Sequence, residues 1–530
     1  MTSEDIELSS KTTTPPIQGW NARDALSAMN EQYAVEIENF FPGNGSVDLR
    51  NGNARAITGL DGQGLAFGSL RYNELDFMLI STVRTGVDKV WSSTGGAVTE
   101  ISGAGVTAAP QFFQQFKDRT FMKDNIGKNP VYHWTGTGNI AASGFVGPGG
   151  ADILLGPMTV YKNRIYFAYR SDVSTTGGLI AGLPEMWYSD LNAITGTLTK
   201  FDFASILQLG GYIQFIGKVT RAKDFSEDEL FAVITSEGEV LLYGGDYPGS
   251  TSSWGLVGRY FIPRPLGSKS FFYLGSTLVI ATRQGLYPMD AIMGGNFANQ
   301  TSSLFGGQLS NIINKAYVAA VNATDAFVFA AVEYYFTGIN YPKGNYLLIN
   351  IPISATTAKQ FVMNTITGAW TLFTNQHATA WTVYKDNLYY LSIIDGVTSF
   401  NSVGMRSDYG AYDEDPYNAG VKLARTIKLR PAYNYFGDTE NYKQFTFCIP
   451  TVYQSNGLSL TIDADVDYAN TTATSLNTDT SKGNSYQIYQ TRCGLQGIGK
   501  AASIRIDGTV TDALLSLQVI EVFWTPANPA

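Results

Sequence analysis

Short apolar stretches separated by glycine-containing turns recur through the first three quarters of the chain. A clear example runs from Asp228 to Gly245, where an apolar strand reaches such a turn and returns as a second strand ending near an aromatic residue. This pattern is typical of a β-hairpin. Seven hairpins of this kind begin near Leu75, Arg119, Asn163, Glu229, Thr277, Tyr346 and Leu388. Several of the intervals between them match the length of one propeller blade.

The repeats predict an all-β fold: a β-propeller of six or seven blades over residues 46–404. A chain of 530 residues exceeds the size at which one hydrophobic core keeps growing, and a radial architecture divides the core among its blades. Trp254, Trp370 and Trp381 are expected to pack between blades. One amphipathic helix is expected within Phe305 to Val321, where apolar residues recur at helical spacing.

The two ends of the chain differ from the repeats. Residues 1–45 are predicted to form a docking arm with a short helix that begins near Asp24. Residues 405–420, with the acidic run Asp413 to Asp415, are expected to be a linker. From Val421 onward the strands are longer, which predicts a β-sandwich or jelly roll over residues 421–530.

Charge and cysteine content narrow the function classes. A net charge of −9 argues against a protein that grips nucleic acid through its whole surface, because that binding needs clustered basic residues. The sequence contains no apolar run of about 20 residues, so it predicts no membrane span. The N-terminus lacks the features of a signal peptide. Cys448 and Cys493 are expected to be buried reduced thiols, although a bridge between them stays open.

Catalytic motifs are scarce in the sequence. The only histidines, His133 and His377, are isolated, and neither zinc-site nor phosphate-loop spacing occurs. The acidic residues Asp224, Glu227, Asp228 and Glu229 crowd one segment, but such crowding usually marks a solvated turn. The sequence therefore predicts a protein that is not an enzyme, with no catalytic residue, metal or cofactor.

The N-terminal region resembles the tail nozzle proteins, also called tail tubular or DNA-stabilisation proteins, of short-tailed podovirus-type bacteriophages. The matching residues are Gly19, Asn21, Asp24, Met29, Ala34, Asn39, Phe40, Phe41, Pro42, Arg50 and Gly52, whereas Ala25 stands where the family often has proline. Further similar stretches run from Gly238 to Asp290 and from Met363 to Phe400. Together the three regions cover roughly a quarter of the chain.

The resemblance implies a structural virion protein in the phage tail, assembled in the host cytoplasm. It implies a homohexameric ring below the portal and adaptor that retains DNA, later ejects it, and anchors fibres, spikes or a needle. Double-stranded DNA would pass without sequence-specific binding. By resemblance, Trp20, Asn21, Asp24, Phe41 and Pro42 are candidate partner-docking residues. The alternative is a glycan-binding or glycan-hydrolysing propeller that recognises a receptor.

Overall fold

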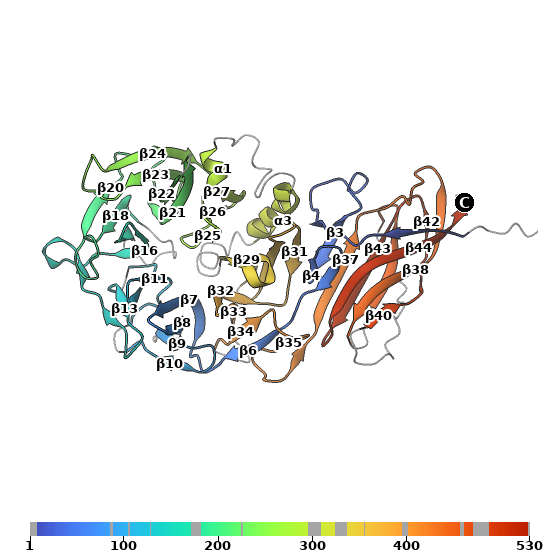
Figure 1. Cartoon of the computed structure of the whole chain (residues 1–530), viewed down its shortest axis with the longest axis horizontal. Coiled ribbons are helices and arrows are strands. Elements are labelled where there is room, and N and C mark those ends of the chain that lie inside the picture. Colours follow the sequence, from blue (N-terminus) through green and yellow to red (C-terminus); the bar gives the residue numbers. More distant parts are fainter. Residues whose placement is uncertain are drawn as a thin grey trace, which may run out of the picture.

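The structure is a computed structural model of the chain. It describes residues 8–527 except 85–87, 104–105, 128, 171–181, 224–225, 295–308, 324–335, 355, 395–400, 456–459 and 470–486. Strands make up 55% of the structure and helices 4%, which confirms the all-β prediction. Figure 1 shows a ring of small sheets beside a two-layered sandwich.

Within the described residues, the ring contains six four-stranded blades and one three-stranded sheet. Each begins with its innermost strand, as expected for a propeller. The first three blades are β7 (Gln63–Tyr72), β8 (Leu75–Val83), β9 (Lys89–Ser93) and β10 (Val98–Glu100); β11 (Phe112–Phe116), β12 (Arg119–Lys123), β13 (Tyr132–Trp134) and β14 (Ala141–Ala142); and β16 (Leu155–Tyr161), β17 (Arg164–Tyr169), β18 (Glu185–Tyr188) and β20 (Thr199–Asp202).

The remaining blades follow in chain order around the ring. They are β21 (Ile213–Lys223), β22 (Ser226–Thr235), β23 (Glu239–Gly245) and β24 (Trp254–Phe261); the three-stranded β25 (Phe271–Leu274), β26 (Thr277–Thr282) and β27 (Gly285–Pro288); β28 (Thr337–Tyr341), β29 (Tyr346–Pro352), β30 (Ala358–Asn364) and β31 (Trp370–Phe373); and β32 (Ala378–Tyr384), β33 (Asn387–Ser392) and β34 (Gly404–Ser407).

The last blade takes its fourth strand from the beginning of the chain. Strand β6 (Asn53–Ile57) pairs antiparallel with β34, and Ile57 lies opposite Gly404. The innermost strand β32 also contacts β7 of the first blade. This pairing closes the ring and joins residues that are far apart in sequence.

Aromatic residues fill the spaces between blades, as predicted for the three tryptophans. Trp254, Trp370 and Trp381 are 7%, 1% and 4% exposed. The Trp254 ring lies 6.3 Å from that of Tyr161 and 6.4 Å from that of Tyr166, both on the preceding blade. Large aromatic side chains bury much apolar area and pair in such geometries, so they hold neighbouring blades together.

Strands from both ends of the chain build the sandwich. In one sheet β4 (Phe40–Pro42), β5 (Val47–Leu49), β44 (Leu515–Ala527), β38 (Tyr442–Gln454) and β40 (Gln487–Gln490) lie in that order. Strand β1 (Ser9–Thr13) joins β44, and β41 (Cys493–Gly494) and β42 (Ile498–Gly499) join β38. Strands β1 and β4 of the predicted arm are thus part of the sandwich.

The other sheet of the sandwich continues into the propeller. Strands β2 (Gly19–Trp20), β3 (Tyr33–Glu38), β37 (Arg425–Pro431), β43 (Ala502–Val510) and β39 (Leu460–Val466) extend the blade of β28 to β31, giving nine strands in one sheet. In Figure 1, β3 and β4 lie between β31 and β37. A single hydrogen-bonded sheet therefore connects the ring and the sandwich.

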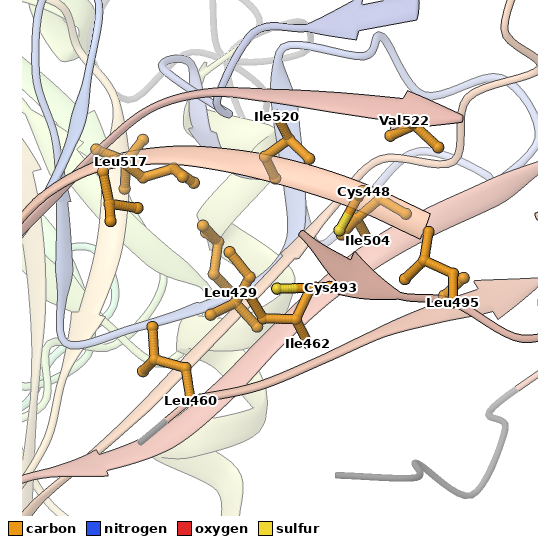
Figure 2. Packing of buried hydrophobic residues seen from close by; sticks show 14 of the residues in the cluster. Leu429, Cys448, Leu460, Ile462, Cys493, Leu495, Ile504, Leu517, Ile520 and Val522 are labelled. Carbon is orange, nitrogen blue, oxygen red and sulfur yellow. The ribbon is translucent and has the colours of Figure 1, made fainter. Parts of the chain in front are cut away.

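The sandwich core contains aliphatic residues, several aromatic rings and the two cysteines, part of which Figure 2 shows. Cys448 on β38 and Cys493 on β41 are direct cross-strand partners, and both are buried free thiols. Burial and the neighbouring Cys493 raise the pKa of Cys448 well above its usual value, with the hydrogen bond to Cys493 as the larger cause. This agrees with the reduced state favoured by the sequence.

One predicted helix is confirmed and another is wrong. Helix α3 (Leu309–Ala323) lies where the amphipathic helix was predicted, and residues 305–308 fall outside the described part. The short helix near Asp24 is absent: the segment forms turns and then strand β3. A register shift between Ala34 and Glu36 leaves Ala34 and Ile37 both buried, so a β-bulge produced the helix-like spacing of three.

The remaining short elements connect these layers. They are α1 (Met289–Met293), the 3-10 turns η1 (Pro148–Gly150) and η2 (Pro342–Gly344), the parallel pair β15 (Phe145–Val146) and β19 (Gly196–Thr197), and the hairpin β35 (Asp413–Glu414) and β36 (Lys422–Leu423). Among the described residues, no helix has the length and apolar character that crossing a membrane requires.

Candidate functional site

Trp20, the first predicted docking residue, packs against the propeller. Its ring stacks on Phe361 with centroids 6.2 Å apart and planes 7° apart. Its indole N–H donates a hydrogen bond to the carbonyl oxygen of Val35 at 3.1 Å. Trp20 is half-buried and joins two strands of the nine-stranded sheet, so its main contacts lie within this chain.

Asn21 and Asp24 form the turn that follows Trp20. Asn21 is 2% exposed, and its Oδ1 accepts hydrogen bonds at 3.0 Å from the backbone N–H groups of Arg23 and Asp24. Its Nδ2 donates to Asp24 Oδ2 at 2.9 Å. This side-chain turn fixes the backbone and leaves Asp24 exposed beside Arg23. Asp24 is thus available to a partner, whereas Asn21 is not.

Phe41 and Pro42 contact the blade formed by β28 to β31. The Phe41 ring meets Tyr346 edge-on at 4.6 Å, and the carbonyl oxygen of buried Pro42 accepts a hydrogen bond from Asn364 Nδ2 at 2.9 Å. The structure therefore places four of the five predicted docking residues in internal contacts. Only Asp24 among them is exposed.

A buried polar cluster lies where the N-terminal segment, the propeller and the sandwich meet. We call Asn39, Arg50, Thr374, Asp413 and Arg425 the junction cluster. The Arg50 guanidinium donates to both carboxylate oxygens of Asp413, at 3.0 and 2.5 Å, and the two side chains are each 1% exposed. A bidentate pair of this kind is strong and geometrically specific. The supposed acidic linker is therefore anchored in the interior at Asp413.

Asn39 and Arg425 complete the cluster. Asn39 adopts φ = 60° and is fully buried; its Oδ1 accepts from Arg50 Nε at 2.8 Å and from the Thr374 N–H at 2.9 Å. Arg425 donates to the carbonyl oxygen of Arg50 at 2.5 Å. Burial, with the nearby Arg50, lowers the pKa of Arg425 to about 10. Each buried polar group thereby ties one segment to another.

Two glycines permit close backbone approach around this junction. At Gly19, where φ is +76°, a Cβ atom would lie 2.4 Å from the carbonyl oxygen of Trp370. At Gly52 it would lie 1.8 Å from the carbonyl oxygen of Tyr412. Both positions exclude a side chain without a shift of the backbone. Residues singled out by the family resemblance, Gly19, Asn39, Arg50 and Gly52, thus have defined structural roles here.

The inner strands of the propeller enclose a second region, which we call the channel mouth. It is a cavity of about 290 Å³. The aromatic side chains that line it are those of Phe67, Phe112, Phe113, Phe271, Phe336 and Trp381. Gln111, Gln114, Thr337 and Lys269 supply polar groups, and none of the described lining residues is a carboxylate. No sequence motif indicates this site; its one signal is the aromatic residues near the start of several innermost strands.

The crowded acidic segment lies elsewhere, at the hairpin of β21 and β22. Asp228 pairs with Arg221 at 3.3 Å and Glu229 with Lys218 at 3.3 Å, all partly exposed. These are surface ion pairs between neighbouring strands, as the solvated interpretation predicted. Asp224 lies outside the described residues. Within the described part of the chain, no three His, Cys, Asp or Glu side chains gather as metal ligands.

The two histidines stay apart from each other. Burial lowers the pKa of His133, with a contribution from Arg119, and desolvation lowers the pKa of His377. Both imidazoles are therefore held toward the neutral form. His133 pairs across β12 and β13 with Phe121, whereas His377 precedes β32 at the rim of another cavity.

The chain aligns with solved structures of similar propeller architecture but with no known sequence family. No family model matches the chain, and no curated protein matches it in sequence. Solved structures that align include an exo-β-1,3-galactanase from Phanerochaete chrysosporium, with 12% identity over 72% of this chain and 99% of that chain (TM-score 0.25). A glycoside hydrolase family 43 arabinoxylan arabinofuranohydrolase from Bacillus subtilis aligns with 10% identity over 70% and 95% (TM-score 0.22). A Trypanosoma rangeli sialidase mutant displaying trans-sialidase activity aligns with 10% identity over 93% and 97% (TM-score 0.30).

These comparisons correct the expectation that the chain is not an enzyme. The named proteins are glycoside hydrolases and a sialidase mutant, and these activities are those of the named proteins. At TM-scores of 0.22 to 0.30 the likeness is limited to architecture and names no reaction for this chain.

Proposed function

We propose that the chain is a subunit of the ring-shaped tail nozzle of a short-tailed bacteriophage. In this role it retains the packaged genome below the portal and adaptor, conducts DNA during ejection, and carries fibres or spikes. The observation that carries the proposal is the N-terminal residue pattern, of which Asn39 and Arg50 belong to the junction cluster.

The junction supports this proposal through rigidity. A conduit subunit has to hold its ring contacts and its partner contacts in fixed relative positions. Here the nine-stranded sheet and the Arg50–Asp413 pair connect the propeller with the sandwich, and both features use the resembling residues. A net charge of −9 also disfavours tight adhesion of DNA, since binding through counterion release needs basic side chains.

Assembly tests the proposal. Purified protein, alone and mixed with an adaptor ring, is examined by cryo-electron microscopy and mass photometry. Sixfold rings are expected, whereas a persistent monomer under both conditions contradicts the nozzle.

The exposed turn is tested with Asp24→Asn, which should weaken adaptor binding. Asp202→Asn, at the edge of a propeller blade, is the matched surface control.

A second candidate function is supported by the channel mouth. Aromatic rings pack against the C–H faces of sugars, and the amides of Gln111 and Gln114 suit hydroxyl groups, so this lining has the chemistry of a glycan-binding or glycan-processing propeller. A glycan array, followed by turnover assays on each bound glycan, tests it. Loss of binding in Gln114→Ala would support this site, and an array without binders would contradict it.

A further inference from the structure

A second cavity lies away from the channel mouth, where the hairpin of β35 and β36 extends the sheet of the last blade beyond β6. Its volume is about 260 Å³, somewhat below the roughly 300–1,000 Å³ of common small-molecule pockets. It is large enough for one small ring-shaped ligand. We call it the side pocket, and it is lined by Thr356, Asn375, His377, Tyr390, Ser392, Ile393, Glu414, Asp415, Pro416, Tyr417 and Leu423.

Tyr390 contributes its side chain to the wall of the side pocket. The side chain is 3% exposed and lines the side pocket, and its ring lies 4.8 Å from Trp381. Burial raises the pKa of Tyr390, so the hydroxyl stays protonated and can donate a hydrogen bond. A ligand oxygen that accepts from this hydroxyl would gain a hydrogen bond inside the pocket.

His377 and Asn375 add two more polar groups at the rim. His377 Nδ1 accepts a hydrogen bond from the backbone N–H of Ala358 at 3.4 Å. In a neutral imidazole this arrangement places the proton on Nε2, which is therefore a donor. The Asn375 amide makes no side-chain hydrogen bond to a described residue, and it offers both a donor and an acceptor.

The carboxylates of the side pocket are held in place by the backbone. Glu414 accepts from the N–H groups of Arg55 and Gly420, each at 2.9 Å, and Asp415 accepts from that of Tyr417 at 2.8 Å. The described lining residues include neither lysine nor arginine. Fixed negative charge without a counter-charge disfavours an anionic ligand and leaves lone pairs for hydroxyl donors.

We propose that the side pocket binds a neutral saccharide ring. The faces of Tyr390 and Tyr417, with Ile393, suit the C–H surfaces of a sugar, while the Tyr390 hydroxyl and the rim groups suit its hydroxyls. The site is separate from the channel mouth and goes beyond the nozzle role. A neutral hexose or N-acetylhexosamine is expected to bind, and a sialic or uronic acid is not.

Saturation-transfer difference NMR on the intact protein tests the proposal. The panel is glucose, galactose, N-acetylglucosamine and N-acetylneuraminic acid. At least one neutral sugar should show saturation transfer, and Tyr390→Phe should weaken its affinity roughly two- to tenfold, the usual effect of one hydrogen bond. Tyr389→Phe, at the next position of the same strand, is the matched control and should bind like the wild type.

Three outcomes overturn the inference: no neutral sugar binds, only the acidic sugar binds, or Tyr390→Phe binds as tightly as the wild type. Thermal unfolding checks that each variant is folded. Should Tyr390→Phe fail to fold, Asn375→Gly carries the test, since φ at Asn375 is +67° and glycine accepts that conformation. Unchanged affinity in Asn375→Gly would then contradict the proposal.

Discussion

Replacing Asp413 by asparagine should destabilise the protein far more than its small change in shape implies. The substitution keeps the size of the side chain and removes its charge. Arg50 is then left as a cation in a site that is 1% exposed, beside a second guanidinium at Arg425. Removing one partner of a buried ion pair typically costs about 3–5 kcal/mol, because the remaining charge is desolvated without compensation.

Urea denaturation followed by tryptophan fluorescence measures this loss. The midpoint for Asp413→Asn should fall by an amount equivalent to about 3–5 kcal/mol in the free energy of unfolding. Glu36→Gln is the matched control: Glu36 pairs with Lys428 at 3.3 Å, and both side chains are more than 40% exposed. Such a surface pair is expected to contribute about 0–1 kcal/mol.

Hydrogen exchange locates the effect. Amides of β6 and β35, which pair at Asn53 and Asp413, should lose protection in Asp413→Asn before those of the distant fourth blade. A loss below about 1 kcal/mol, or loss of protection spread evenly over the ring, would refute the reasoning that this pair holds the junction together.

Other substitutions test other parts of the fold. Gly52→Ala should destabilise by about 1–3 kcal/mol or more because its Cβ meets the Tyr412 carbonyl, while Gly255→Ala, with no atom within 4 Å, should not; urea midpoints compare them. Trp254→Ala should cost about 3–5 kcal/mol by opening the aromatic cluster between blades, measured in the same way. The pKa values of His133 and His377 are lowered by folding, so stability should decline as pH falls below about 6.5, and His133→Gln should lessen that decline in thermal scans.

The propeller could be predicted from the sequence because its signals are local. A strand, a glycine turn and a returning strand lie within about 20 residues, so each hairpin is visible in one window. The helix α3 was predictable for the same reason. The strand β3 was not: its bulge between Ala34 and Glu36 imitates helical spacing, and its partners β31 and β37 lie more than 300 residues away.

The candidate sites were harder to predict because they depend on distant pairings. The exposed position of Asp24 and the inward positions of Phe41 and Pro42 follow from contacts with a blade near residues 346–364. The side pocket combines residues from β33 with the segment after β35. Single residues such as His377 and Tyr390 carry no spacing signal, so no sequence window brings them together.

The placement of β1 and β6 has a consequence for synthesis on the ribosome. Strand β6 pairs with β34, which is synthesised about 350 residues later, and β1 pairs with β44, which is synthesised about 500 residues after β1. At the usual 5–20 residues per second, the first of these partners arrives roughly 20–70 s after β6 emerges. Until then its strand edges are open to other nascent chains, so truncated products should aggregate and chaperones should improve the yield of the full-length protein.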